Sequence, residues 1–215
     1  MLWHKSQGAG GAGGNITGEL IEAKHSNTGS VSLSSAPQAG DLLIAHTGGY
    51  AGGSSLTTTG SYPFTQVASY NSAAWYTTSP YYFFEGSRMG YRIATGSEGT
   101  SISVGGPDTA LSVYRFSSPV TSVTSAFTAT QQGVANRTIT TSSYDKPHIV
   151  ACTVGSQADP SLAMTNQDYS SREGYCDAAA SLRNSDSTLT TAVITSNNVS
   201  FNEACCYAVL VPNFD

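Results

Sequence analysis

The sequence has few charged residues, and this scarcity limits the functions it can have. Charged side chains make up 11% of the 215 residues, against about 25% in an average soluble protein. The nine Lys and Arg residues are dispersed, and the formal net charge is −5. The chain therefore lacks the concentrated basic surface that nucleic acid requires, and we expect no nucleic-acid partner.

Long apolar runs are also missing from the sequence. No stretch reaches the length of about 18 apolar residues that a membrane-spanning helix needs, so no membrane partner is expected. Lys5 is not followed by an apolar segment, so the N-terminus does not predict a secretory signal.

The four cysteines lack the spacing of a zinc site, because no C-x-x-C pair occurs. Cys152 and Cys206 lie in apolar runs, where a cysteine usually acts as a small buried hydrophobe. In a strand, the adjacent Cys205 and Cys206 would point to opposite faces. We expect reduced thiols, with a disulfide as the less favoured alternative, and neither a metal nor a cofactor.

Signatures of catalysis are missing as well. The sequence contains no G-x-S-x-G, no H-E-x-x-H and no phosphate-binding loop. His46 and His148 occupy similar places in two apolar runs, so they are candidates for a pair, but two structural histidines are the favoured interpretation. We therefore expect a protein that is not an enzyme.

A glycine-rich stretch near the N-terminus resembles a nucleotide-binding motif only in its letters. Residues 8–13, "GAGGAG", match G-x-G-x-x-G. That motif needs a strand before it and a helix after it, and the flanking "MLWHKSQ" and "NITGELIEA" suit neither. We interpret residues 1–15 as a flexible Gly-rich arm whose partner-binding residues are Leu2, Trp3 and His4.

The chain does contain many short runs of β-branched and aromatic residues. They are separated by turn residues roughly every 8–12 positions, which is typical of sandwiches and barrels. We predict an all-β, antiparallel two-sheet sandwich, jelly-roll-like, formed as a single domain by residues 16–215. One short helix or an irregular loop is expected within 168–186.

Two halves of the chain show a weak similarity. A core-like run after a polar turn begins each half, "AGDLLIAHTGG" (39–49) and "YDKPHIVACTVG" (144–155). Another apolar run ends each half, "ALSVYRFSS" (110–118) and "CCYAVLVPN" (205–213). These runs either pair in related positions of the two halves or are simply central strands, since the identity is too low to define a repeat.

Aromatic residues concentrate in "YNSAAWYTTSPYYFFEG" (70–86). In a strand, rings would lie on both faces, and an exposed aromatic strip marks a protein contact or a sugar platform. We select Trp75, Tyr76 and Tyr82 as the residues that contact a partner or a glycan. Burial of these rings in the core with an ordinary surface is the alternative.

Several segments together resemble a family of bacteriophage virion proteins with a jelly-roll-like domain. The segments are "SSAPQAGDLLIAHTGG" (34–49), the region around Trp75, "GYRIATGSEGTSISV" (90–104) and "ALSVYRFSSP" (110–119). The resemblance implies a structural component of the virion, either a capsid decoration (cement) protein or a tail-associated protein. It implies other virion proteins as partners and a homo-oligomer, with a trimer expected by analogy. It carries over no catalytic residues.

Two alternatives to a structural role remain. The first is a carbohydrate-binding head module of a tail fibre, which recognises the host. The second is a polysaccharide depolymerase, which would need two acidic residues at glycosidase spacing in a deep cleft.

Overall fold

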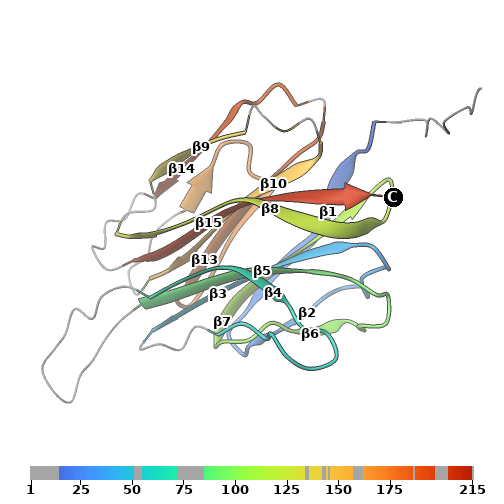
Figure 1. Ribbon diagram of the computed structural model, residues 1–215. Coiled ribbons are helices and arrows are strands. Elements are labelled where there is room, and N and C mark those ends of the chain that lie inside the picture. The colour runs from blue at the N-terminus through green and yellow to red at the C-terminus, as the bar shows by residue number, and fades with distance from the viewer. Residues whose placement is uncertain are drawn as a thin grey trace, which may run out of the picture.

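The computed structural model describes residues 15–50, 55–71, 85–133, 136–141, 144, 146–156, 162–185, 187–196 and 203–214. In this part of the chain all the secondary structure is β, and the strands form two five-stranded sheets, one three-stranded sheet and one two-stranded sheet (Figure 1). The strand pairs are antiparallel, so the predicted all-β antiparallel class is confirmed.

The first half of the chain contributes seven strands: β1 (Gly18–Ser26), β2 (Ser30–Ser32), β3 (Leu42–Tyr50), β4 (Thr65–Asn71), β5 (Glu85–Ile93), β6 (Ser101–Ser103) and β7 (Asp108–Phe116). The second half contributes eight: β8 (Val120–Gln132), β9 (Arg137–Thr140), β10 (His148–Gly155), β11 (Leu162–Met164), β12 (Tyr169–Glu173), β13 (Cys176–Arg183), β14 (Thr191–Ser196) and β15 (Ala204–Phe214). Each half therefore builds its own sheets.

The two halves share one topology. The first half has the strand order β1-β7-β3-β5-β4 with the small sheet β2-β6, and the second has β8-β15-β10-β13-β12 with the small sheet β9-β14-β11. Each strand of the first order has a counterpart at the same chain position in the second, from β1 and β8 to β4 and β12. The predicted similarity is confirmed, since β3 pairs with β7 as β10 pairs with β15.

Contacts between equivalent residues support a twofold relation of the halves. Ile44 and Ile149 both point into the core between the large sheets, and their ladder partners are Ser112 and Leu210. Phe116 and Phe214 each lie four residues beyond those partners, and their rings touch with centroids 5.3 Å apart. The flanks agree, because β1 lies against β12 and β4 lies against β8.

Three cores alternate with the sheets. A central core lies between the two five-stranded sheets, and one further core lies beneath each small sheet. On β3, Leu42 and Ile44 enter the central core, whereas Leu43 and Ala45 enter the core beneath β2 and β6. A strand covered on both faces reads as a continuous apolar run, and this explains the run that the sequence shows here.

The cysteines follow the same alternation. Cys205 belongs to the core beneath β9, β11 and β14, and the adjacent Cys206 belongs to the central core, so they point to opposite faces as predicted. All four cysteines are buried thiols and none forms a disulfide.

The expectation for residues 168–186 is wrong. They form the hairpin of β12 and β13, which turns at Gly174 with a φ of 53°. Ala178, Ala179 and Ala180 favour a helix when isolated. Here all three are fully buried, with Ala179 in the core beneath the three-stranded sheet and Ala180 in the central core. Packing on both faces of β13 therefore outweighs their helix propensity.

Candidate functional site

The residues selected from the sequence as contact sites cannot be placed. Leu2, Trp3 and His4 of the arm, and Trp75, Tyr76 and Tyr82 of the aromatic segment, lie outside the described residues. The described strands nonetheless locate the ends of the aromatic segment, which joins β4 to β5.

The two candidate histidines have separate structural roles. The His46 ring is fully buried, with Nδ1 2.6 Å from Thr153 Oγ1 and Nε2 2.7 Å from the Tyr169 hydroxyl. His148 Nδ1 donates to the Lys146 carbonyl at 2.9 Å. Thr153 and His148 both lie on β10, five positions apart, so their side chains point to opposite faces of its sheet. The structure therefore does not pair the histidines.

Burial controls the protonation of His46. Loss of solvent lowers its pKa to about 3, because the charged imidazolium is poorly solvated in the core. The ring is therefore neutral at physiological pH, and one nitrogen donates a hydrogen bond while the other accepts one. Burial also raises the pKa of the Tyr169 hydroxyl, which stays protonated beside it.

The buried carboxylates hold turns and strands together. Both oxygens of Asp41 accept hydrogen bonds from Arg115, each at 2.8 Å, and Oδ2 also accepts from the Gln38 backbone at 2.7 Å. Asp108 on β7 accepts from the Tyr175 backbone at 3.1 Å, which ties the β12–β13 turn to the opposite sheet. Among the described residues, no group of three His, Cys, Asp or Glu side chains is arranged to hold a metal ion.

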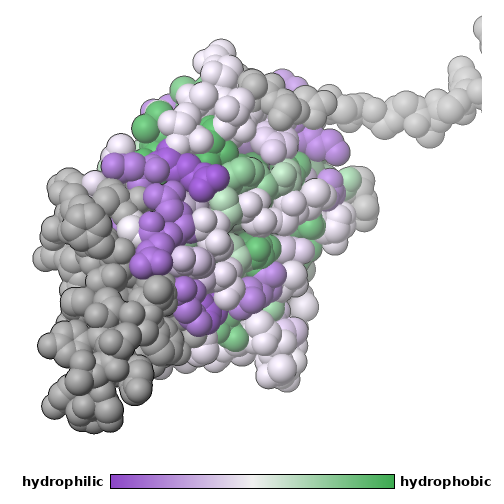
Figure 2. Space-filling view, turned by 60° about the vertical axis from the view of Figure 1, so that its left-hand side comes forward, coloured by the Kyte–Doolittle hydropathy of each residue, from purple (hydrophilic) through white to green (hydrophobic). Residues whose placement is uncertain are grey.

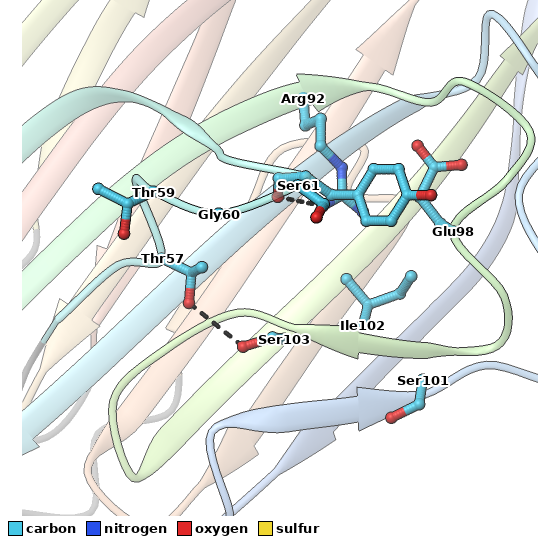
Figure 3. A pocket seen from close by; sticks show the side chains of 10 residues that line it. Thr57, Thr59, Gly60, Ser61, Arg92, Glu98, Ser101, Ile102 and Ser103 are labelled. Atoms are coloured by element: carbon cyan, nitrogen blue, oxygen red, sulfur yellow. Dashed lines mark hydrogen bonds between the residues drawn. The ribbon is translucent and has the colours of Figure 1, made fainter.

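One polar hollow of about 260 Å³ opens beside β6 and the end of β5 (Figure 3). The residues that line it come from the loop before β4, from the end of β5, from the turn after it and from β6: Thr57, Thr59, Gly60, Ser61, Tyr62, Arg92, Glu98, Ser101, Ile102 and Ser103. Most of these side chains are short and hydroxylated, so the hollow can hydrogen-bond a small polar molecule.

Arg92 forms the most buried charged part of this hollow. Its side chain is 8% exposed, Nη1 donates to the Tyr62 carbonyl at 2.5 Å, and the guanidinium carbon lies 4.7 Å from the centre of the Phe64 ring. Arg183 occupies the equivalent position on β13, where its Nη1 donates to the Leu189 carbonyl at 3.2 Å. Because both halves bury an arginine here, Arg92 has a role in the architecture as well as in the hollow.

Glu98 supplies the negative charge of the hollow. Burial raises its pKa, but hydrogen bonds from the backbone of Thr95 and Gly96 and the charge of Arg92 outweigh burial, so the pKa is lowered. The carboxylate is therefore ionised at neutral pH. Sequence reasoning recognised this turn as a structural feature of "GYRIATGSEGTSISV" and missed the hollow. The available signal was two charged residues close together in a chain with few of them.

The two flanks of the stacked sheets differ in charge. One flank consists of the edge strands β4 and β8, whose sequences TQVASYN and VTSVTSAFTATQQ contain no charged residue and no proline. We call it the uncharged flank. The opposite flank consists of β1 and β12, and β1 alone carries Glu19, Glu22 and Lys24. Figure 2 shows that pale residues of intermediate hydropathy cover much of the face in view.

Comparisons with protein-family models, with curated proteins and with solved structures give no match. In the described part of the chain, no helix is long and apolar enough to cross a membrane.

Proposed function

We propose that the protein is a non-enzymatic structural component of a phage virion, either a capsid decoration protein or a tail-associated protein. Its partners are other virion proteins and copies of itself. In this proposal the sandwich is jelly-roll-like, and residues 1–15 serve as a Gly-rich arm that binds a neighbouring subunit.

The uncharged flank carries the proposal. Soluble proteins protect exposed sheet edges with charges, prolines or short strands, because an open edge pairs with other chains. β8 has 13 residues, eight of them exposed, and no charge. An edge of this kind suits a protein that is assembled with others in repeated contacts. The resemblance to phage virion proteins supplies the particular assembly.

The experiment is to measure the protein in purified phage particles by quantitative mass spectrometry. We expect it to be present, with hundreds of copies for a head protein or a few to tens for a tail protein. Deleting residues 2–14 should weaken its association with the particle while leaving the thermal unfolding of the isolated protein almost unchanged. Absence from particles would refute the proposal.

Carbohydrate binding is a second candidate function, which the hollow beside β6 favours. Its hydroxyl groups and the ionised Glu98 can accept and donate hydrogen bonds to the hydroxyls of one sugar unit, beside the Tyr62 ring. Binding to host polysaccharide, lost in Glu98→Gln and retained in the control Glu19→Gln on the exposed face of β1, would support it. A glycan array without binding would refute it.

A further inference from the structure

The uncharged flank and its opposite have the same origin in the topology but different chemistry. β8 is the counterpart of β1, and β12 is the counterpart of β4. Of these equivalent strands, β1 carries a Lys24–Glu22 ion pair at 2.6 Å and β8 carries no charge at all. The fold therefore does not demand an uncharged edge. The difference needs a cause specific to the β4–β8 flank.

We propose that the uncharged flank is the contact between two copies of this chain, related by a twofold axis perpendicular to the large sheets. Deepening the assembly role proposed above, this contact pairs β8 with β8 of the second copy and β4 with its own counterpart. Each pair is antiparallel, as a twofold axis requires. The two five-stranded sheets of each copy then continue into ten-stranded sheets.

The backbone of β8 provides the hydrogen bonds of this contact. Only one side of β8 is paired, with β15, so about half of its backbone N–H and C=O groups point outward. The same holds for β4, which pairs only with β5. These outward groups are satisfied when an antiparallel strand is added to each edge, as in other cases of strand addition.

A second copy fits this edge better than a charged partner does. Like charges placed opposite each other across a strand pair are destabilising, and a strand without charges escapes this penalty when it pairs with itself. The exposed side chains of β8 are mostly Ser and Thr, which form favourable cross-strand pairs with each other.

The nearest cations are already engaged within the chain. Arg88 on β5 donates to the Tyr70 carbonyl of β4 at 3.0 Å and to Asn71 Oδ1 at 2.9 Å. Arg137 lies over the Phe127 ring of β8, with its guanidinium carbon 5.5 Å from the ring centre. Neither arginine gives the flank a charge that calls for an acidic partner.

The middle of β8 is where the twofold axis falls in this arrangement. Ala126 is the extra residue of a β-bulge, because Phe127 pairs with Val209 and Ser125 pairs with Leu210. Ser125, exposed and next to this bulge, then lies close to its own copy. A single substitution at Ser125 therefore tests the contact twice, once in each chain.

The first test is the solution mass, measured by light scattering coupled to size exclusion. We expect about twice the chain mass of 22.3 kDa for the purified protein. In S125K/T128K, lysines face each other across the axis, so the mass should fall to that of one chain with an unchanged circular dichroism spectrum. The control T59K/S97K adds the same charge at exposed turn residues and should keep the double mass.

The second test is disulfide cross-linking. Ser125→Cys should form an intermolecular disulfide under mild oxidation, because residues opposite each other in an antiparallel pair lie about 4.5–5.5 Å apart. The native thiols are all buried, and the control His25→Cys on the opposite flank should not cross-link.

A protein that stays at the mass of one chain, a trimeric mass, or cross-linking of both cysteine variants alike would each overturn the proposed contact. The outcome is separate from the virion proposal. A twofold dimer that is absent from particles would refute the virion role alone, whereas a single-chain mass with presence in particles would refute the contact alone.

Discussion

Replacing His46 with glutamine should flatten the dependence of stability on acid pH. In the folded protein His46 is fully buried and its pKa is lowered to about 3 by burial, whereas an unfolded histidine titrates near its ordinary 6.5. Between these values the unfolded chain binds a proton that the folded chain does not. Stability from this residue is therefore complete above about pH 6.5 and is lost as the pH falls toward 3.

The size of the effect follows from the difference in pKa. Each pH unit below 6.5 costs about 1.4 kcal/mol of unfolding free energy. At pH 5 the loss from His46 is therefore about 2 kcal/mol. In His46→Gln the amide can still donate to one of Thr153 and Tyr169 and accept from the other, but it does not titrate.

The assay is urea unfolding of both proteins at pH 7, 6 and 5. We expect the wild type to lose about 2 kcal/mol more than His46→Gln between pH 7 and pH 5. Comparing the two proteins cancels the other groups, such as His148, whose pKa burial also lowers. His25→Gln, which removes an exposed imidazole, is the matched control. Equal pH profiles for the wild type and His46→Gln, or an NMR titration of His46 near pH 6.5 in the folded protein, would refute the reasoning.

Two other predictions concern the packed interior. A Cβ at Gly48 would overlap the backbone of Tyr175 and lie 2.6 Å from Cys176 Cα, so Gly48→Ala should cost about 3 kcal/mol by thermal or chemical unfolding. Gly99→Ala meets no atom within 4 Å but has a φ of 71°, so it should cost only about 1 kcal/mol, and equal losses would contradict the packing argument. Burial raises the pKa of the Cys152, Cys176 and Cys206 thiols, the last to about 11. Maleimide should therefore label no cysteine in the native protein and four in denaturant, and rapid native labelling would show that a thiol is accessible.

The shared topology of the two halves explains how a chain with so little charge forms a large interior. Each half makes a five-stranded sheet with one face covered by its own small sheet, and the other face is covered by the equivalent sheet. The equivalent positions have diverged where the sheets meet. The alignment that pairs Ile44 with Ile149 also places His46 opposite Ala151 and Gly48 opposite Thr153. His46 fills the space that these small residues leave and bonds to Thr153.

Much of the strand content was predictable from local pattern. The runs around residues 42–49 and 148–155 are apolar in succession because both faces of those strands are covered, and such runs stand out in a polar sequence. The hairpin of β12 and β13 was not predictable, because its buried alanines have no β propensity of their own. The hollow beside β6 was missed for a similar reason, since Tyr62, Arg92 and Glu98 meet only when the loop before β4 folds over β5 and β6.

The sequence by itself determined the all-β class, the absence of a basic surface, the opposite orientation of Cys205 and Cys206, and the related runs of the two halves. These features depend on composition and on the period of two along a strand, which are local properties of the chain. Only the tertiary structure decided that the halves share a topology, that His46 and His148 lie on different faces, and that one flank is free of charge. Those facts depend on which strands become neighbours and which become edges, and that depends on contacts between residues far apart in the chain.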